Sequence, residues 1–261
     1  MHSRYDARPA LQDARPYHAA VMLPAALKAP QIHPELAAKA RHSVQWLRDA
    51  VRDHVKVVYS SSLGPEAVVL TDLIWTEVPG IDILTLDTGR LPQETLELLA
   101  RQEAFYGRRV RVVVPAAADV EKYVAAHGIN GFYHSVEERQ YCCHVRKVLP
   151  FRRAIQGYAA WVTGVRREQS VNRAQGAVID KDQYGLAKIS PLLDWTEAEV
   201  WTWILAKGLP YNVLHDRHYA SIGCAPCTRA ILPGQDQRAG RWWWETDDTR
   251  ECGLHPGEPA R

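Results

Sequence analysis

The segment VKVVYSSSLGPEAVVLTDLIW, residues 55–75, decides the fold. Its first six residues, VKVVYS, are rich in β-branched side chains and predict a short strand. The loop SSLGPE follows, and the apolar run AVVLTDLIW (67–75) predicts a helix. A strand, a tight loop and a helix in this order form the repeating unit of a parallel sheet that carries helices on its faces.

The same order recurs along the chain. Further strands are predicted at 81–89, 108–115 and 159–164, and helices at 34–54, 94–107 and 136–155. Strands that are almost wholly apolar and separated by helices predict a mostly parallel, doubly wound α/β sheet that is buried on both faces. Ligands of such sheets bind beyond the carboxyl ends of the strands, which here lead into the loops 60–66 and 87–91.

Two further elements are expected after the fourth strand. Residues 177–192 alternate around Tyr184 and Gly185, which predicts a hairpin. A helix is predicted to begin after the cap Thr196, with Glu199 completing a capping box and Gly208 ending it. Residues 1–31 carry four prolines and no sustained periodicity, so we expect a loose N-terminal arm before an α/β domain at 32–241.

Composition limits the classes of partner. A formal net charge of +2 does not by itself indicate nucleic-acid or membrane binding. No apolar run approaches the roughly 20 residues of a membrane span, the N-terminus lacks the order of a secretory signal, and Asp6 and Asp13 disfavour a transit peptide. We therefore expect a cytoplasmic protein.

The five cysteines indicate chemistry rather than packing. An odd number spread over 261 residues is not a secreted disulfide framework. Four of them form the adjacent pair Cys142 and Cys143 in YCCHVRK and the C-x-x-C pair Cys224 and Cys227 in GCAPCTR. The fifth, Cys252, lies in the polar segment ECGLHP (251–256), which suits a thiol that must be reached rather than buried.

The two cysteine pairs together can supply four thiolates to one metal centre. Adjacent side chains on a helix lie about 100° apart, so binding one centre with both members of the first pair requires a particular backbone geometry. A cluster several ångströms across accommodates that geometry more readily than a single zinc ion. The alternative is that the first pair packs in the core and the second is a redox pair or half a zinc site.

These motifs carry a family resemblance. The CC and C-x-x-C pairs, ECGLH, LDTGRL (86–91) and TGVRREQS (163–170) together resemble the assimilatory adenylyl-sulfate (APS) reductases, within the wider phosphoadenylyl-sulfate (PAPS) reductase family. The match runs from about residue 57 to residue 256. It implies a sheet of the adenine-nucleotide α-hydrolase-like type, followed at 242–261 by a mobile C-terminal tail that carries the catalytic cysteine.

The resemblance implies a specific reaction. The Cys252 thiolate attacks the sulfur of APS, AMP leaves, and a thiol of thioredoxin or glutaredoxin releases sulfite from the resulting S-sulfocysteine. This is the sulfate-reducing step of sulfate assimilation toward cysteine biosynthesis. A free thiol has a pKa of roughly 8.5, so neighbouring positive charge should favour the thiolate. His255, three residues further on, is expected to assist as a catalytic residue.

The substrate is an anion, and arginine suits sulfate and phosphate oxygens because its planar fork bonds two of them at once. By resemblance Lys147, Arg173, Arg238 and Arg241 bind these groups. The serines Ser60 and Ser62 occupy the place of the Ser-Gly-Gly-x-Asp-Ser loop of related ATP pyrophosphatases, whose double glycine and aspartate are missing here. They are expected to bind the sulfated monophosphate, or instead to cap the following helix. The residues expected at the adenosine pocket are Leu86, Asp87, Thr88, Gly89 and Gly164.

The resemblance also implies one 4Fe-4S cluster per chain, held by the four paired cysteines. Because thiols deliver the two electrons, the reaction needs no redox step at the cluster, and we expect it to order the site and to shape its electrostatics through Lys147. The run WWW at 242–244 is expected to pack the arm that carries Arg238 and Arg241 rather than to stack bases.

Other functions remain open from the residues alone. One is an ATP-dependent tRNA thiolation enzyme of the PP-loop class, disfavoured by the missing loop residues and by the absence of a basic RNA-binding domain. A second is a non-catalytic, zinc-stabilised nucleotide-binding module. Within the family, the double cysteine pair favours APS, although PAPS as sole or second substrate stays an alternative. Oligomeric state is left open.

Overall fold

The computed structural model describes residues 29–169 and 177–246, so the predicted arm and most of the predicted tail lie outside it. Within the described ranges, the strands form one six-stranded sheet in the order β3-β2-β1-β4-β6-β5. Neighbouring strands are parallel except for the antiparallel β5–β6 hairpin. The strands are β1 Val57–Ser61, β2 Asp82–Leu86, β3 Arg111–Val113, β4 Ala160–Val162, β5 Ile179–Lys181 and β6 Ala187–Ile189. The predicted doubly wound α/β fold is confirmed.

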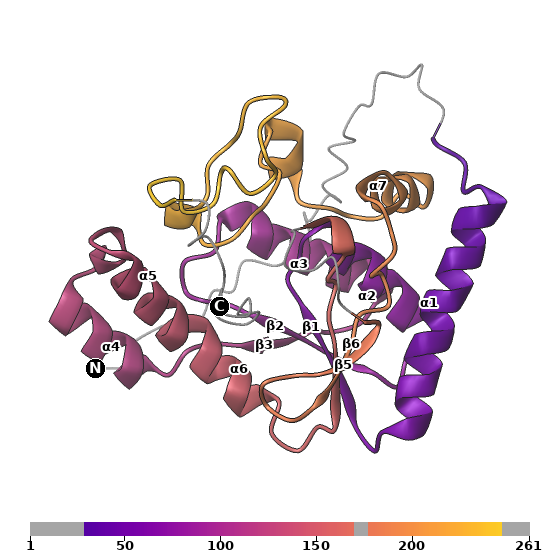
Figure 1. The fold of residues 1–261 in the computed structure, drawn as a ribbon, viewed down its shortest axis with the longest axis horizontal. Coiled ribbons are helices and arrows are strands. Elements are labelled where there is room, and N and C mark those ends of the chain that lie inside the picture. The colour runs from indigo at the N-terminus through magenta and orange to yellow at the C-terminus, as the bar shows by residue number, and fades with distance from the viewer. Residues whose placement is uncertain (1–28, 170–176, 247–261) are drawn as a thin grey trace, which may run out of the picture.

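Helices cover the sheet and extend beyond one end of it (Figure 1). They are α1 Pro34–Asp53, α2 Pro65–Glu77, α3 Gln93–Tyr106, α4 Ala117–His127, α5 Val136–Cys143, α6 Leu149–Ala154 and α7 Glu197–Ala206. Short 3-10 turns lie at η1 Gly131–Tyr133, η3 Arg167–Gln169, η5 Val213–Arg217 and η6 Ala225–Cys227. None of the helices in the described ranges is long and apolar enough to cross a membrane.

Alternation along the central strand creates the two buried layers. Val57 and Tyr59 pack into the larger core with α1, α2 and α7, whereas Val58 between them packs against α6 on the opposite face. Because successive side chains of a strand point to opposite faces, a strand that is apolar at every position must be covered on both sides. The run VKVVYS therefore required helices on both faces of the sheet.

The helix predicted at 136–155 is interrupted. Residues His144–Val148, directly after the cysteine pair, form a π-helical turn, η2, between α5 and α6. Pro150 lacks an N–H and cannot donate to the carbonyl four residues earlier, which disfavours a regular helix at this point. Such wide turns occur frequently at functional sites. The adjacent cysteines thus lie at the end of a regular helix, directly before this turn.

The start of α7 offers a test of local stability. Thr196 accepts a hydrogen bond from Glu199 N, and Glu199 accepts one from Thr196 N at 2.7 Å, so the predicted capping box is confirmed. We expect Thr196→Ala to lower the free energy of unfolding by about 1 kcal/mol, because Glu199 N loses its side-chain acceptor, whereas the backbone N–H of residue 196 can still donate to Glu199. Urea titration measures this change, and Thr196→Ser should retain most of the stability. An unchanged midpoint in the alanine variant would contradict the role of the cap.

Candidate active site

A pocket of about 260 Å³ opens at the carboxyl ends of β1, β2 and β4. From β1 the chain runs through β2 to β3 on one side and then returns to β4 on the other side of β1, so the ends of β1 and β4 form a topological switch point. Backbone loops diverge there and leave a crevice for a ligand. The pocket therefore lies where sheet topology alone places a binding site.

Most of the binding residues expected from the sequence surround this pocket, but Asp87 and Gly89 do not line it. Those in the described ranges that line it are Ser60, Ser62, Leu86, Thr88, Lys147, Gly164, Arg238 and Arg241. They come from three strand ends, the π-helical turn and the segment before the predicted tail. Arg173, Cys252 and His255 lie outside the described residues. Side chains separated by up to 181 positions thus share one concave surface, while their individual roles stay predictions.

The serine loop is held by its own hydroxyls. Ser61 Oγ accepts from Leu63 N at 3.3 Å, and Ser62 Oγ accepts from Gly64 N at 3.4 Å. Leu63 has φ 59°, a left-handed conformation that bulky residues rarely adopt. The N-cap of α2 is Gly64, and no side chain caps the helix. The serines therefore do not cap α2, which was the alternative expected from the sequence. The loop instead turns its hydroxyls and the helix start toward the pocket.

Arg166 is buried behind Glu66 of the pocket wall and is not a solvated charge. Its side chain is 2% exposed and lies 2.7 Å from Glu66 and 3.0 Å from Glu168. Gly164 permits this approach, because a Cβ at that position would lie 3.0 Å from Glu66 Cβ. Arg167 pairs instead with Asp194 at 2.6 Å. Glu66 and Glu168 therefore both neutralise Arg166, and Arg167 has a separate partner.

The two arginines of the final described segment are positioned by an aromatic ring. Trp242 is buried, with the guanidinium carbons of Arg241 and Arg238 at 4.6 and 5.8 Å from its ring. Arg241 N also donates to Arg238 O at 2.8 Å. A Cβ on Gly223 would lie 2.5 Å from Arg241 Cζ, so the guanidinium occupies the space a side chain there would need. The predicted packing role of this tryptophan is confirmed.

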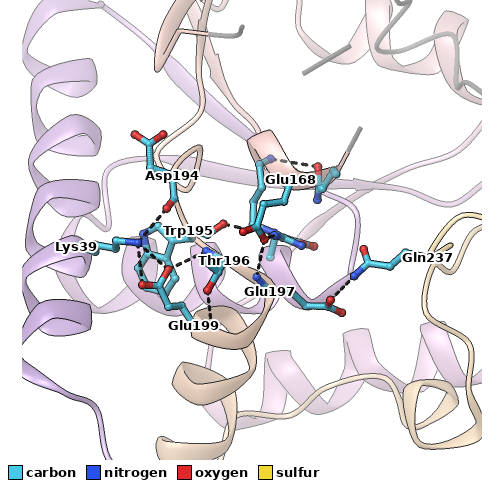
Figure 2. Close-up of polar contacts among 11 residues, drawn as sticks. Lys39, Glu168, Asp194, Trp195, Thr196, Glu197, Glu199 and Gln237 are labelled. Atoms are coloured by element: carbon cyan, nitrogen blue, oxygen red, sulfur yellow. Dashed lines mark hydrogen bonds and ion pairs between the residues drawn. The ribbon is translucent and has the colours of Figure 1, made fainter. Parts of the chain in front are cut away.

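A polar network ties this segment to the helices behind it (Figure 2). Gln237 donates to Glu197 at the start of α7, and Glu197 N donates to Glu168 at 3.2 Å. Lys39 of α1 donates to Asp194 O and pairs with Glu199 at 2.8 Å. Arg238, next to Gln237, is thereby connected to the wall that holds Arg166.

The four paired cysteines line a second, smaller cavity of about 20 Å³ beside the pocket. Its other walls come from Arg90, Phe132, Arg139, Arg146, Lys147 and Pro226. Lys147 lines both cavities, and Thr88 Oγ1 of the pocket lies 3.2 Å from Cys224 Sγ. The cysteine cavity and the pocket are therefore adjacent and share residues.

The charged side chains that line the cysteine cavity are all cationic. Burial raises the pKa of the Cys227 thiol to about 12, with Cys224 adding to the effect and Arg241 and Lys147 opposing it. Burial also raises the pKa of Cys142, against the charge of Arg146. Buried thiolates would repel each other, so four of them require cationic neighbours or a bound cation.

No group of three or more His, Cys, Asp or Glu side chains in residues 29–169 and 177–246 is arranged to hold a metal ion. The four thiols share a cavity, yet they do not converge on a point. Two buried donors beside them, Arg146 Nε and Trp244 Nε1, have no hydrogen-bond partner among the described residues. A polyatomic group with acceptor atoms suits this cavity better than one ion does.

Some pocket and cavity residues were missed from the sequence. Arg90 and Arg146 line the cysteine cavity, and Arg146 Nη1 donates to Thr88 O at 2.8 Å. Both stood inside motifs already singled out, LDTGRL and YCCHVRK, so their proximity to the marked residues was a usable signal. Gln169, which lies inside the motif TGVRREQS, also lines the pocket, as does Ile222, which no sequence pattern marked.

The sheet, its switch-point pocket and the basic side chains around it define an α/β protein that binds an anionic ligand at its strand ends. Comparison with protein families narrows this class. Residues 56–230 match the model of the phosphoadenosine phosphosulfate reductase domain. The chain belongs to this family.

Curated relatives cover most of the chain. A protein of Burkholderia cepacia named adenosine 5'-phosphosulfate reductase is 51% identical over 223 residues, 85% of this chain and 89% of that protein. One of the same name from Allochromatium vinosum is 51% identical over 219 residues, 84% of this chain and 86% of its own length. The similarity is therefore not confined to one motif or one part of the fold.

Solved structures agree on the fold. A phosphoadenylyl-sulfate reductase from Candida auris, in a phosphate complex, superposes with a TM-score of 0.63 at 24% identity, covering 78% of this chain and all of that one. A Candida glabrata FMN adenylyltransferase superposes with a TM-score of 0.53 at 13% identity, covering 91% and 83%. At these identities the comparison supports the α/β fold alone.

Proposed function

We propose that the protein reduces adenylyl sulfate to sulfite and AMP, using electrons from a separate thiol carrier, thioredoxin or glutaredoxin. Its place would be cytoplasmic sulfate assimilation toward cysteine biosynthesis. The observation that carries the proposal is the 51% identity over 85% of the chain to a relative named adenosine 5'-phosphosulfate reductase. The basic pocket at the switch point supports it, because the substrate is a dianionic nucleotide.

The pocket residues divide by chemistry. Lys147, Arg238 and Arg241 would neutralise the sulfonate and phosphate oxygens, with Arg173 joining them. Ser60 and Ser62 would donate to the same oxygens. The residues proposed to line the adenosine side are Leu86, Thr88 and Gly164. This division is supported by the position of these residues, because all of them that the structure describes line the same cavity.

The proposed reaction balances in two steps. Cys252 Sγ, as a thiolate, forms a bond to the APS sulfur while the bond from that sulfur to the phosphate oxygen breaks, so AMP leaves with the electron pair. His255 would stabilise the leaving phosphate. A carrier thiolate then attacks Cys252 Sγ and sulfite departs; the second carrier thiol resolves the mixed disulfide and regenerates the Cys252 thiol. Two electrons pass from the dithiol to sulfur.

We further propose that Cys142, Cys143, Cys224 and Cys227 hold one 4Fe-4S cluster. The shared cavity, the surrounding cations and the unpartnered donors Arg146 Nε and Trp244 Nε1 are the observations that fit such a group. When bound, the cluster would cross-link α5 and the 224–227 turn and fix the local charge. Lys147 would then be held between the cluster and the sulfonate.

Turnover on the two candidate nucleotides tests the substrate. Anaerobically purified protein with thioredoxin is expected to release sulfite from APS with kcat/KM at least about tenfold higher than from PAPS, a difference of about 1.4 kcal/mol in transition-state binding. PAPS differs from APS by a 3'-phosphate, and none of the residues expected to bind substrate is assigned to that phosphate. Reduction of PAPS with APS ignored would contradict the APS assignment and favour the alternative that the protein is a PAPS reductase.

A further inference from the structure

Arg139 of α5 is the most deeply buried cation beside the cysteine cavity among the described residues. It is 1% exposed, and its Nε and Nη2 donate to the two carboxylate oxygens of Glu245 at 2.9 and 2.7 Å. The Glu245 side chain is 3% exposed. A two-point, charge-assisted contact of this kind fixes both distance and orientation. It joins residues that are 106 positions apart.

The same guanidinium also contacts the cysteine centre and Trp242. Arg139 lines the cysteine cavity, and its Cζ lies 4.6 Å from the centre of the Trp242 ring. Burial lowers the pKa of Arg139, but the hydrogen bonds and charge of Glu245, with a smaller contribution from Cys143, outweigh burial and raise it. Arg139 therefore joins the cavity of the cysteine pair to Trp242 and Glu245, which are among the first residues of the predicted tail.

Backbone contacts hold that segment at the same place. Trp242 N donates to Cys227 O at 3.2 Å, and Glu245 N donates to Trp242 O at 2.8 Å. A buried ion pair adds little stability over an apolar pair of similar size, because both charges lose water. What it supplies is a single permitted geometry. The pair is thus better suited to fixing where residue 245 lies than to stabilising the fold.

We propose that Arg139 and Glu245 are positioning residues that anchor the chain before Cys252 to the helix carrying the cysteine pair. This inference rests on the proposed function. Cys252 follows Glu245 by seven residues, and a chain of that length spans at most about 25 Å. With residue 245 fixed close to the pocket-lining residues Arg241 and Trp242, the reach of the Cys252 thiol is measured from a fixed point near the proposed sulfonate site. Its effective concentration there rises accordingly.

Glu245→Gln tests the anchor while leaving Arg139 beside Cys143. At saturating APS without carrier, the rate of adduct formation on Cys252 is expected to fall roughly 10- to 100-fold, because a misplaced nucleophile reacts slowly. APS affinity and iron content are expected to stay at the wild-type level, since Lys147, Arg238 and Arg241 are unchanged. Quenched mass spectrometry of the last peptide gives the rate, and equilibrium binding gives the affinity.

A second readout does not depend on APS chemistry. Trypsin cleavage after Arg241, which is 7% exposed, is expected to be severalfold faster in Glu245→Gln than in the wild type. The matched control is Glu77→Gln, which removes an exposed 3.0 Å pair with Arg48 and should change neither readout. If wild-type protein forms no adduct on Cys252 but Glu245→Gln is cleaved faster than the wild type, the proposed function is wrong and the anchoring role of Glu245 is supported. Unchanged cleavage overturns the anchor.

The double variant Arg139→Gln with Glu245→Gln covers the case in which a single variant does not fold. It buries two amides and no uncompensated charge. If the two residues act through each other, its adduct rate should match that of the slower single variant, rather than the product of the two losses. The proposal would be overturned if the loss of rate in the double variant equals the product of the two single losses. It would also be overturned if the folded double variant forms the adduct at the wild-type rate.

Discussion

Cys252→Ser is expected to form no measurable sulfite from APS, a loss of roughly three orders of magnitude or more. The proposed nucleophile is a thiolate, and a serine hydroxyl at the same position is not ionised near neutral pH without a dedicated base. The measurement is sulfite release with thioredoxin, paired with mass spectrometry of the final peptide in the absence of carrier. Wild-type protein should gain the mass of one SO3 group on that peptide, and the variant should gain none.

The variant also separates binding from chemistry. APS should bind Cys252→Ser as tightly as it binds the wild type, because the described pocket lining, including Lys147 and Arg241, is intact. Thr249→Ser, a conservative change three residues earlier, is the control and should retain most turnover. Sulfite formation by Cys252→Ser at a comparable rate would show that the sulfo group never resides on this sulfur, and the proposed mechanism would be wrong.

Cys143→Ser is expected to lose iron and turnover together. The serine oxygen is a poorer iron ligand than a thiolate, and Cys143 lines the cavity shared by the other three cysteines and Lys147. Losing the cluster would remove the cross-link between α5 and the 224–227 turn, and so disturb Thr88, which lies 3.2 Å from Cys224 Sγ. Iron analysis, absorbance near 400 nm and sulfite release measure the three consequences.

Tyr141→Phe is the control for this experiment. Tyr141 lies on the same helix, is 40% exposed, and its substitution should leave iron content and turnover unchanged. A Cys143→Ser protein without iron that turns over normally would show that the cluster has no part in ordering the site. If the anaerobically purified wild type contains stoichiometric zinc and shows no absorbance near 400 nm, the four cysteines hold zinc and the proposed cluster is wrong.

Local pattern was sufficient to predict most of the sheet. The strand–loop–helix unit at 55–75, the hairpin around Gly185 and the capping box at Thr196 all lie in the structure where the residues indicated. Each depends on interactions within a few residues, namely apolar alternation, turn chemistry or a cap. That a ligand site lies beyond the carboxyl ends of the strands followed from the predicted parallel sheet, whereas the strand order that creates the switch point was not predicted.

The helix α4 was not predicted, and its composition explains why. Tyr123 is its one fully buried residue, so the segment 117–127 has no apolar stripe to give a helical period. Its side chains instead pack locally: the Tyr123 and His127 rings stack at 5.1 Å, and His127 pairs with Glu138 of α5. Contacts between neighbouring helices decide its conformation, and they leave no periodic signal in the sequence.

Long-range contacts of charged residues were likewise beyond sequence reasoning. Arg139 and Glu245 each resemble a solvated surface charge in the sequence, yet both are buried and paired across 106 positions. Arg166, Glu66 and Glu168 form a second example. In both cases the partner is set by the three-dimensional packing of loops, which propensities and motifs do not encode.

The space that Gly223 leaves for Arg241 constrains how this family of sequences can diverge. A methyl group at 223 would overlap the guanidinium that lines the pocket, so the two positions cannot be chosen independently. Any homologous chain that carries a larger residue at the position of 223 should also lack, or redirect, the arginine at the position of 241. Correlated change at these two sites would therefore mark the branches in which anion recognition has been rebuilt.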